Sequence, residues 1–222
     1  MKRHFDRDFE AVTDLIVAMG GDVQRALSEA LLGLTERDPV HFERVYQIEN
    51  LINQTHVTVD EQCLKLLALQ SPLASDLRLV VGIIKINTDL ERMGDQAVNL
   101  SQNGYRFLLT EPGNPLVIIP KMAEIVKVMV RQALDAFLQR DVALARRVLE
   151  QDHFVDAHKN EVFDVLKEQM RTDPAAIDRA LELILIARNL ERIADHATNI
   201  AEDAIFIVSG EDVRHGRGDS GT

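Results

Sequence analysis

Apolar residues recur along most of the chain at alternating steps of three and four, which is the period of one face of an amphipathic helix. The pattern is clearest twice, at Ile83, Ile86, Leu90, Met93, Ala97 and Leu100, and again at Leu183, Ile186, Leu190, Ile193, Ala197, Ile200, Ala204 and Ile207. A narrow, heptad-like stripe is buried only when partner helices run nearly parallel to it. The pattern therefore predicts a bundle of long helices.

Short segments rich in proline, glycine and aspartate interrupt this pattern and mark the expected helix ends. They are TERDPV (35–40), LQSPLASD (69–76), LLTEPGNPL (108–116), LQRDVA (138–143) and RTDPAAID (171–178). Asp38-Pro39, Ser71-Pro72 and Asp173-Pro174 each combine a capping side chain with proline at the first helical position. These breaks predict six helices of about 25–35 residues each.

The strongest break, at 108–116, divides the expected helices into two trios. We therefore predict an all-α protein made of two tandem three-helix bundles related by internal duplication. The first bundle covers 1–110 and the second covers 116–209, with a linker at 111–115 and a flexible C-terminal tail at 210–222.

The clearest sign of duplication is one dodecapeptide, DLERMGDQAVNL (89–100), which is repeated with changes as NLERIADHATNI (189–200). Leucine, glutamate, arginine, aspartate, alanine and asparagine occupy the same places in both copies. A weaker match aligns RVYQIENLIN (44–53) with RVLEQDHFVD (147–156). The two halves thus repeat their second and third helices.

The repeated motif stacks oxygen-bearing side chains at i, i+4 and i+8 on one helix face, which we expect to lie opposite the core. The ligand candidates are Glu91 and Asp95 with Asn99 as accessory, and Glu191 and Asp195 with Asn199 as accessory. Asp152 and Asp156 repeat the four-residue spacing one helix earlier, whereas the first half has Glu49 and Asn53 there. Neighbouring carboxylates repel unless a cation lies between them, and oxygen ligands favour hard or borderline cations. A solvated outer face would explain the same residues without a ligand.

Composition and charge exclude several function classes. The formal net charge of −11, with no basic stripe, argues against a nucleic-acid partner. Cys63, the one cysteine, fits a buried small side chain. The longest apolar run, LRLVVGIIKI (77–86), is too short to span a bilayer, and no signal peptide is apparent at the N-terminus. We expect a cytoplasmic protein that meets a membrane only through partners.

Together, the doubled LERxxD…N motif, SPLASDLRLVVGIIKI (71–86) and VSGEDVRH (208–215) resemble the PhoU family. The likeness runs from Arg7 to His215. It implies a cytoplasmic homodimer of two three-helix bundles that regulates phosphate uptake. The implied partners are the ATPase subunit of a phosphate ABC transporter and a phosphate-sensing histidine kinase, which the protein keeps inactive when phosphate is plentiful.

The resemblance also implies metal binding through E(D)-x-x-x-D motifs, carried here by Glu91 with Asp95, Glu191 with Asp195, and Asp152 with Asp156. Mg, Mn, Fe, Zn and Ca are all candidate ions. Asn53 departs from the pattern by replacing the acid that would complete the first half's site beside Glu49. We therefore expect the second site to bind metal more tightly.

Two alternatives to a non-enzymatic regulator stay open, a carboxylate-bound metalloenzyme and a metal-binding or metal-storage protein. His153, His158 and His196 flank the acidic positions and are candidate additional ligands. Ser75 and Asp76 are candidate caps or contact residues at the start of the third helix, with capping favoured.

Overall fold

The structure is a computed structural model that describes residues 4–70, 74–110 and 117–213. Six long helices fill the described residues: α1 (His4–Glu36), α2 (Pro39–Gln70), α3 (Ala74–Leu108), α4 (Ile118–Gln139), α5 (Val142–Thr172) and α6 (Ile177–Ser209), with a short 3₁₀ helix, η1 (Pro174–Ala176), before α6. The all-α prediction is confirmed. Only α4, at 22 residues, falls short of the expected length.

The two Asp-Pro boundaries form as the sequence predicts. The Asp38 carboxylate accepts a hydrogen bond from the backbone N–H of Val40 at 3.0 Å, and that of Asp173 accepts one from Ala175 at 3.1 Å. Each bond satisfies an amide that the helix start leaves without an internal partner. Ser71-Pro72 lies outside the described residues. Ser75 and Asp76 lie within the first turn of α3, where the negative charge of Asp76 is favourable, and their capping role stays a prediction.

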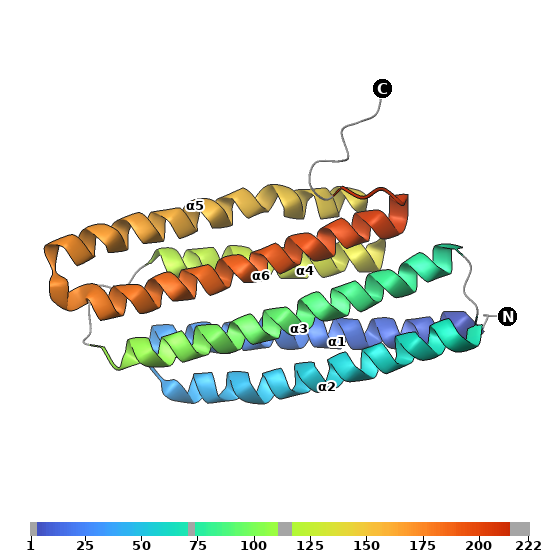
Figure 1. Ribbon diagram of the computed structural model, residues 1–222, viewed down its shortest axis with the longest axis horizontal. Coiled ribbons are helices and arrows are strands. Elements are labelled where there is room, and N and C mark those ends of the chain that lie inside the picture. Colours follow the sequence, from blue (N-terminus) through green and yellow to red (C-terminus); the bar gives the residue numbers. More distant parts are fainter. Residues whose placement is uncertain (1–3, 71–73, 111–116, 214–222) are drawn as a thin grey trace, which may run out of the picture.

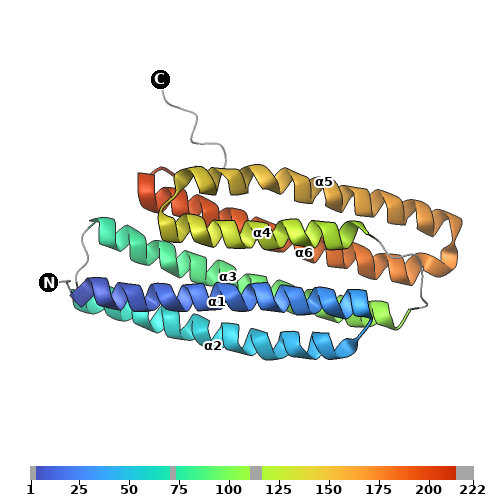
Figure 2. The same cartoon turned by 180° about the vertical axis from the view of Figure 1, so that it is seen from behind.

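The six helices form two antiparallel trios, α1–α2–α3 and α4–α5–α6, which lie on opposite sides of a seam made by α3 and α6 (Figures 1 and 2). Both predicted apolar stripes are buried, including Leu90 and Leu190, which are 0% exposed. Cys63 is buried as well. The buried side chains of both trios belong to one continuous core. Burying each large apolar side chain stabilises the fold by roughly 1.5–3 kcal/mol.

Polar contacts fix the register of α3 against α6. Lys85 pairs with Asp203, while near the other end of the seam Asn189 donates to Asn103 at 3.0 Å. Asn103 also donates to Glu182 at 2.9 Å. Residues early in α3 therefore meet residues late in α6, so the two helices run antiparallel. This arrangement brings the middle of α3 to the middle of α6, where the two copies of the repeated motif lie.

The segments at the predicted unit boundaries are only partly described. The predicted linker at 111–115 lies outside the described residues. Gly210 ends α6 in the left-handed region, with φ at +77°, where glycine carries no steric penalty. Within the predicted tail, Val213 packs against the core, and residues from 214 onward lie outside the described part.

Candidate functional site

The two copies of the repeated motif meet across the α3–α6 seam. Glu91 and Asp95 from α3 and Asp195 from α6 line one polar groove of about 640 Å³. The other lining residues are Arg92, Gln96, Arg192, His196 and Asn199. The sequence indicated two separate outer faces, one for each unit. That expectation is incomplete, because antiparallel packing of α3 and α6 joins both faces into one groove.

The predicted outward orientation is only partly correct. Asp95, Asp195 and Asn199 are exposed, whereas Glu91, Glu191 and Asn99 are half-buried. Glu191 lies where Lys159 of α5 contacts it, and Glu91 lines the groove beside α6. The accessory candidate Asn199 donates to the Asp89 carboxylate at 3.1 Å and so takes part in the seam.

In the second unit, four carboxylates influence one another electrostatically. Although Asp195 is exposed at the groove, the partial burial of its carboxylate raises its pKa to about 6, with further contributions from the charges of Glu191 and Asp152. Burial likewise raises the pKa of Asp152, helped by the charges of Asp156 and Glu191. Asp152, Asp156, Glu191 and Asp195 therefore form an acidic cluster between α5 and α6 that favours either protons or a cation.

A lysine already supplies positive charge to this second-unit acidic cluster. The Nζ of Lys159 donates to Asp156 Oδ1 at 2.6 Å and to Glu191 Oε1 at 3.0 Å. The hydrogen bond to Asp156 is the largest of the effects that raise the pKa of Lys159, so the ammonium stays charged. Sequence reasoning missed this residue. Its signal was the i, i+3 spacing from Asp156, on a helix face that already carried two acids.

The corresponding positions of the first unit are less charged. Asn53 donates to the Glu49 carboxylate, which occupies one oxygen of that predicted ligand. His56 stands where Lys159 stands in the second unit, and its Nε2 lies 3.5 Å from Asp60 rather than beside the predicted ligands. The first unit therefore lacks both the fourth acid and the bridging lysine.

Comparison with known proteins agrees with this duplicated architecture. The family model described as "PhoU domain" matches the chain twice, over residues 16–103 and 119–204. The chain belongs to the PhoU family. This confirms the resemblance seen in the sequence, and each matched segment falls within one of the two helical trios.

Relatives from the PhoU family match along nearly the whole chain. The phosphate-specific transport system accessory protein PhoU homolog of Pseudomonas putida is 38% identical over 97% of this chain and 84% of its own length. The Escherichia coli K12 accessory protein PhoU is 32% identical over 97% of this chain and 89% of its own. These names agree with the phosphate-related role that the sequence motifs implied.

Solved PhoU structures share the fold as well. The crystal structure of PhoU from Pseudomonas aeruginosa superposes with a TM-score of 0.90 at 37% identity, covering 94% of this chain and all of that one. The phosphate transport system regulatory protein PhoU from Streptococcus pneumoniae gives a TM-score of 0.88 at 27% identity, over 95% and 99% of the two chains. The two-bundle prediction is thereby confirmed.

The fit of this PhoU-family chain to a metal ion is mixed. All the predicted ligands are oxygen donors, which suit hard cations. The raised pKa of Asp195 shows that its surroundings disfavour the charged carboxylate, which a bound cation would stabilise. Yet among the described residues no three histidine, cysteine or acidic side chains converge tightly enough to hold one ion. A metal would need these side chains to rearrange.

The three flanking histidines make their contacts outside the predicted ligand set. His153 stacks against Phe154 with ring centroids 3.8 Å apart, His158 pairs with Glu161 at 3.2 Å, and His196 pairs with Asp89 at 2.8 Å. Their role as additional ligands stays a prediction.

Over the described ranges, no helix has the length and apolarity needed to cross a membrane.

Proposed function

We propose that this chain is a non-enzymatic, cytoplasmic accessory regulator of phosphate uptake and of phosphate-starvation signalling. The observation that carries the proposal is the match to PhoU accessory and regulatory proteins over almost the entire chain, in sequence and in fold. In this role the protein contacts the ATPase subunit of a phosphate ABC transporter and a phosphate-sensing histidine kinase. With phosphate plentiful, it keeps that kinase inactive.

The surface of the fold supports an adaptor role. Long helices present apolar side chains to solvent on several faces, among them Leu64 at 63% and Phe154 at 52% exposure. Apolar side chains at such positions are available to pack against a partner protein. A homodimer, as expected from the family resemblance, would cover one such face and leave others for partners.

We further propose that the second-unit acidic cluster is the stronger of two cation-binding faces. Asp152, Asp156, Glu191 and Asp195 would hold the ion, which would supply the neutralising charge that the Lys159 ammonium supplies here. The observation that favours this second role is the gathering of four carboxylates between α5 and α6, where the pKa values of Asp152 and Asp195 are raised. A metal-storage role remains the alternative to regulation.

Titration calorimetry of the purified full chain against the purified ATPase subunit and against the cytoplasmic part of the kinase tests the adaptor role. We expect saturable binding to at least one of them, with a titration against bovine serum albumin as the control. Absence of heat with both partners, each verified as folded, would remove the main support for the adaptor proposal. A Mn²⁺ titration of the same protein tests the cation face separately.

A further inference from the structure

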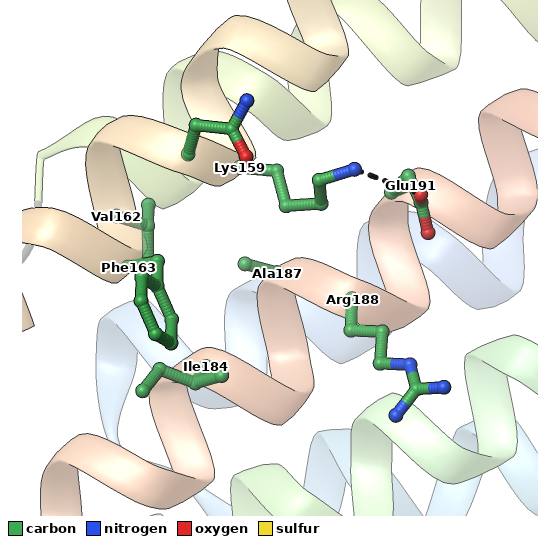
Figure 3. Close-up of a pocket in the computed structure, with 8 residues that line it drawn as sticks. Lys159, Val162, Phe163, Ile184, Ala187, Arg188 and Glu191 are labelled. Carbon is green, nitrogen blue, oxygen red and sulfur yellow. Dashed lines mark hydrogen bonds and ion pairs between the residues drawn. The ribbon is translucent and has the colours of Figure 1, made fainter.

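A second groove lies between α5 and α6 on the second unit, where it shares Lys159 and Glu191 with the second-unit acidic cluster (Figure 3). It encloses about 250 Å³, and its walls include Val162, Phe163, Ile184 and Ala187. Phe163 is 48% exposed although it is one of the largest apolar side chains on α5. A half-exposed aromatic ring beside an apolar hollow provides a surface against which a partner side chain can pack.

The duplicated first unit provides a control for this groove within the same chain. Equivalent positions differ by 100 between α3 and α6 (Asp89 against Asn189) and by 103 between α2 and α5 (Arg44 against Arg147). By this alignment Val59 and Ile84 of the first unit match Val162 and Ile184 of the second, so these two positions are apolar in both units.

The centres of the two sites differ. Phe163 is replaced by Asp60 in the first unit, and Ala187 by Asn87. The fully buried Asn87 donates to Asp60 Oδ1 at 2.9 Å and to the backbone carbonyl of His56 at 3.0 Å. A hydrogen-bonded polar pair therefore occupies the site in the first unit. The second unit has a small residue and an exposed ring instead, and the apolar groove lies between α5 and α6 at this place.

The groove lining carries two cations, Lys159 and Arg188, and one anion, Glu191. Lys159 is already paired with Asp156 and Glu191, which leaves Arg188 as the cation of the lining that can meet an anionic ligand. Arg188 is exposed, lines the groove and makes no hydrogen bond or ion pair with any residue that the structure describes. Its first-unit counterpart is Thr88. The Nζ of Lys167 lies 6.0 Å from the centroid of the Phe163 ring. On a protein with a formal net charge of −11, an unpaired guanidinium beside an apolar hollow fits a ligand that offers both a carboxylate and an apolar group.

The size and position of the groove favour a protein segment over a small molecule. Pockets for small ligands enclose about 300–1,000 Å³ and bury most of the ligand. A hollow of about 250 Å³ between two long helices suits one large side chain of a third helix lying along them. We propose that this groove docks an acidic amphipathic helix of a partner protein, with an apolar side chain beside Phe163 and a carboxylate on Arg188. The proposal deepens the proposed function and rests on it only in assuming that the partner is a protein.

Methyl NMR of the full chain tests the groove directly, because Ile184 lines it and Ile84 marks the equivalent place in the first unit. The probes are two synthetic helical peptides of about four turns with the same leucine anchors, one flanked by glutamates and the other by lysines. We expect the glutamate peptide to shift the Ile184 methyl signal and to leave that of Ile84 unchanged. Equal shifts at both isoleucines, no shift at Ile184, or equally tight binding of the lysine peptide would overturn the proposal.

Two variants separate docking from a folding defect. Arg188→Thr installs the first-unit residue at an exposed position and should weaken the glutamate peptide about tenfold, which is the expected effect of losing one charge-assisted hydrogen bond. Phe163→Asp with Ala187→Asn installs the first-unit polar pair and should abolish the shift. If Arg188→Thr binds the glutamate peptide as tightly as the parent chain does, the predicted carboxylate contact is wrong.

The groove and the proposed function can fail separately. If the parent chain binds the transporter ATPase or the kinase, and Arg188→Thr and Phe163→Ala bind equally well, the groove proposal fails while the regulator role stands. If the parent chain binds neither partner but the glutamate peptide shifts Ile184, the regulator role loses its support while the docking groove stands.

Discussion

Replacing Lys159 with methionine removes one charge from the second-unit acidic cluster and keeps the length of the side chain. The ammonium makes two ion pairs, at 2.6 Å to Asp156 and at 3.0 Å to Glu191. Exposed pairs contribute about 0.2–1 kcal/mol each. The Glu191 side chain is only 23% exposed, so its pair belongs at the upper end of that range. We expect Lys159→Met to lower the free energy of unfolding by about 1–2 kcal/mol at pH 7.

The assay is urea unfolding followed by circular dichroism, in low salt with a chelator present. Lys65→Met is the matched control, because Lys65 lies 3.9 Å from Glu61 with both side chains about two-thirds exposed. Lys65→Met should lower the free energy of unfolding by less than about 0.5 kcal/mol. In about 1 M salt the loss of stability caused by Lys159→Met should be smaller, because the Debye length falls to about 3 Å and the ion pairs are screened.

A divalent cation should then compensate for the missing ammonium. Adding millimolar Mn²⁺ should stabilise Lys159→Met more than the parent chain, because binding to the native state alone raises stability through linkage. If Lys159→Met and Lys65→Met lose the same stability, Lys159 does not neutralise the cluster. The electrostatic account of the second unit would then be wrong.

Three further predictions follow from other parts of the structure. The pKa of Asp195 is raised to about 6 from a usual value of 3.8, so its charge destabilises the fold increasingly as the pH rises from about 4 to 6. Asp195→Asn should therefore raise the free energy of unfolding at pH 7 by about 1 kcal/mol, after allowance for solvent screening. The same substitution should leave the free energy of unfolding unchanged near pH 4, as measured by urea titration at both pH values. Asn53→Asp restores the acid missing from the first unit and should strengthen Mn²⁺ binding measured by calorimetry, and unchanged affinity would exclude the first unit as a cation face. A Cβ atom at Gly104 would lie 2.5 Å from the buried ring of Phe42, so Gly104→Ala should lower stability by about 1–3 kcal/mol in thermal unfolding, whereas Gly21→Ala, with nothing within 4 Å, should stabilise by about 0.5–1 kcal/mol.

Local patterns predicted most of the fold because they act over short distances in the sequence. The stripe through Leu90 and Leu190 follows from helical periodicity, and the Asp38 and Asp173 caps follow from the chemistry of a helix start. The duplication was visible in the repeated dodecapeptide. These features require no knowledge of which helix packs against which.

The arrangement of the site was harder to predict because it depends on contacts between distant residues. Nothing in the sequence near Asp89 indicates that it pairs with His196, or that the seam joins the two motifs into one groove. In the sequence Lys159 resembles an ordinary surface residue, because its contact with Glu191 depends on the packing of α6 against α5. Periodicity shows which face of a helix is apolar, but it does not show which neighbour covers the other faces.

Alkaline phosphatase activity in a strain that lacks this gene tests the central claim most directly. Cells are grown with excess phosphate, and the deletion strain is compared with its parent and with the deletion strain carrying the intact gene. The account predicts high secreted activity in the deletion strain and silencing when the gene returns. Activity as low as in the parent strain would contradict a role in holding the starvation response inactive and would favour cation binding as the main role of the chain.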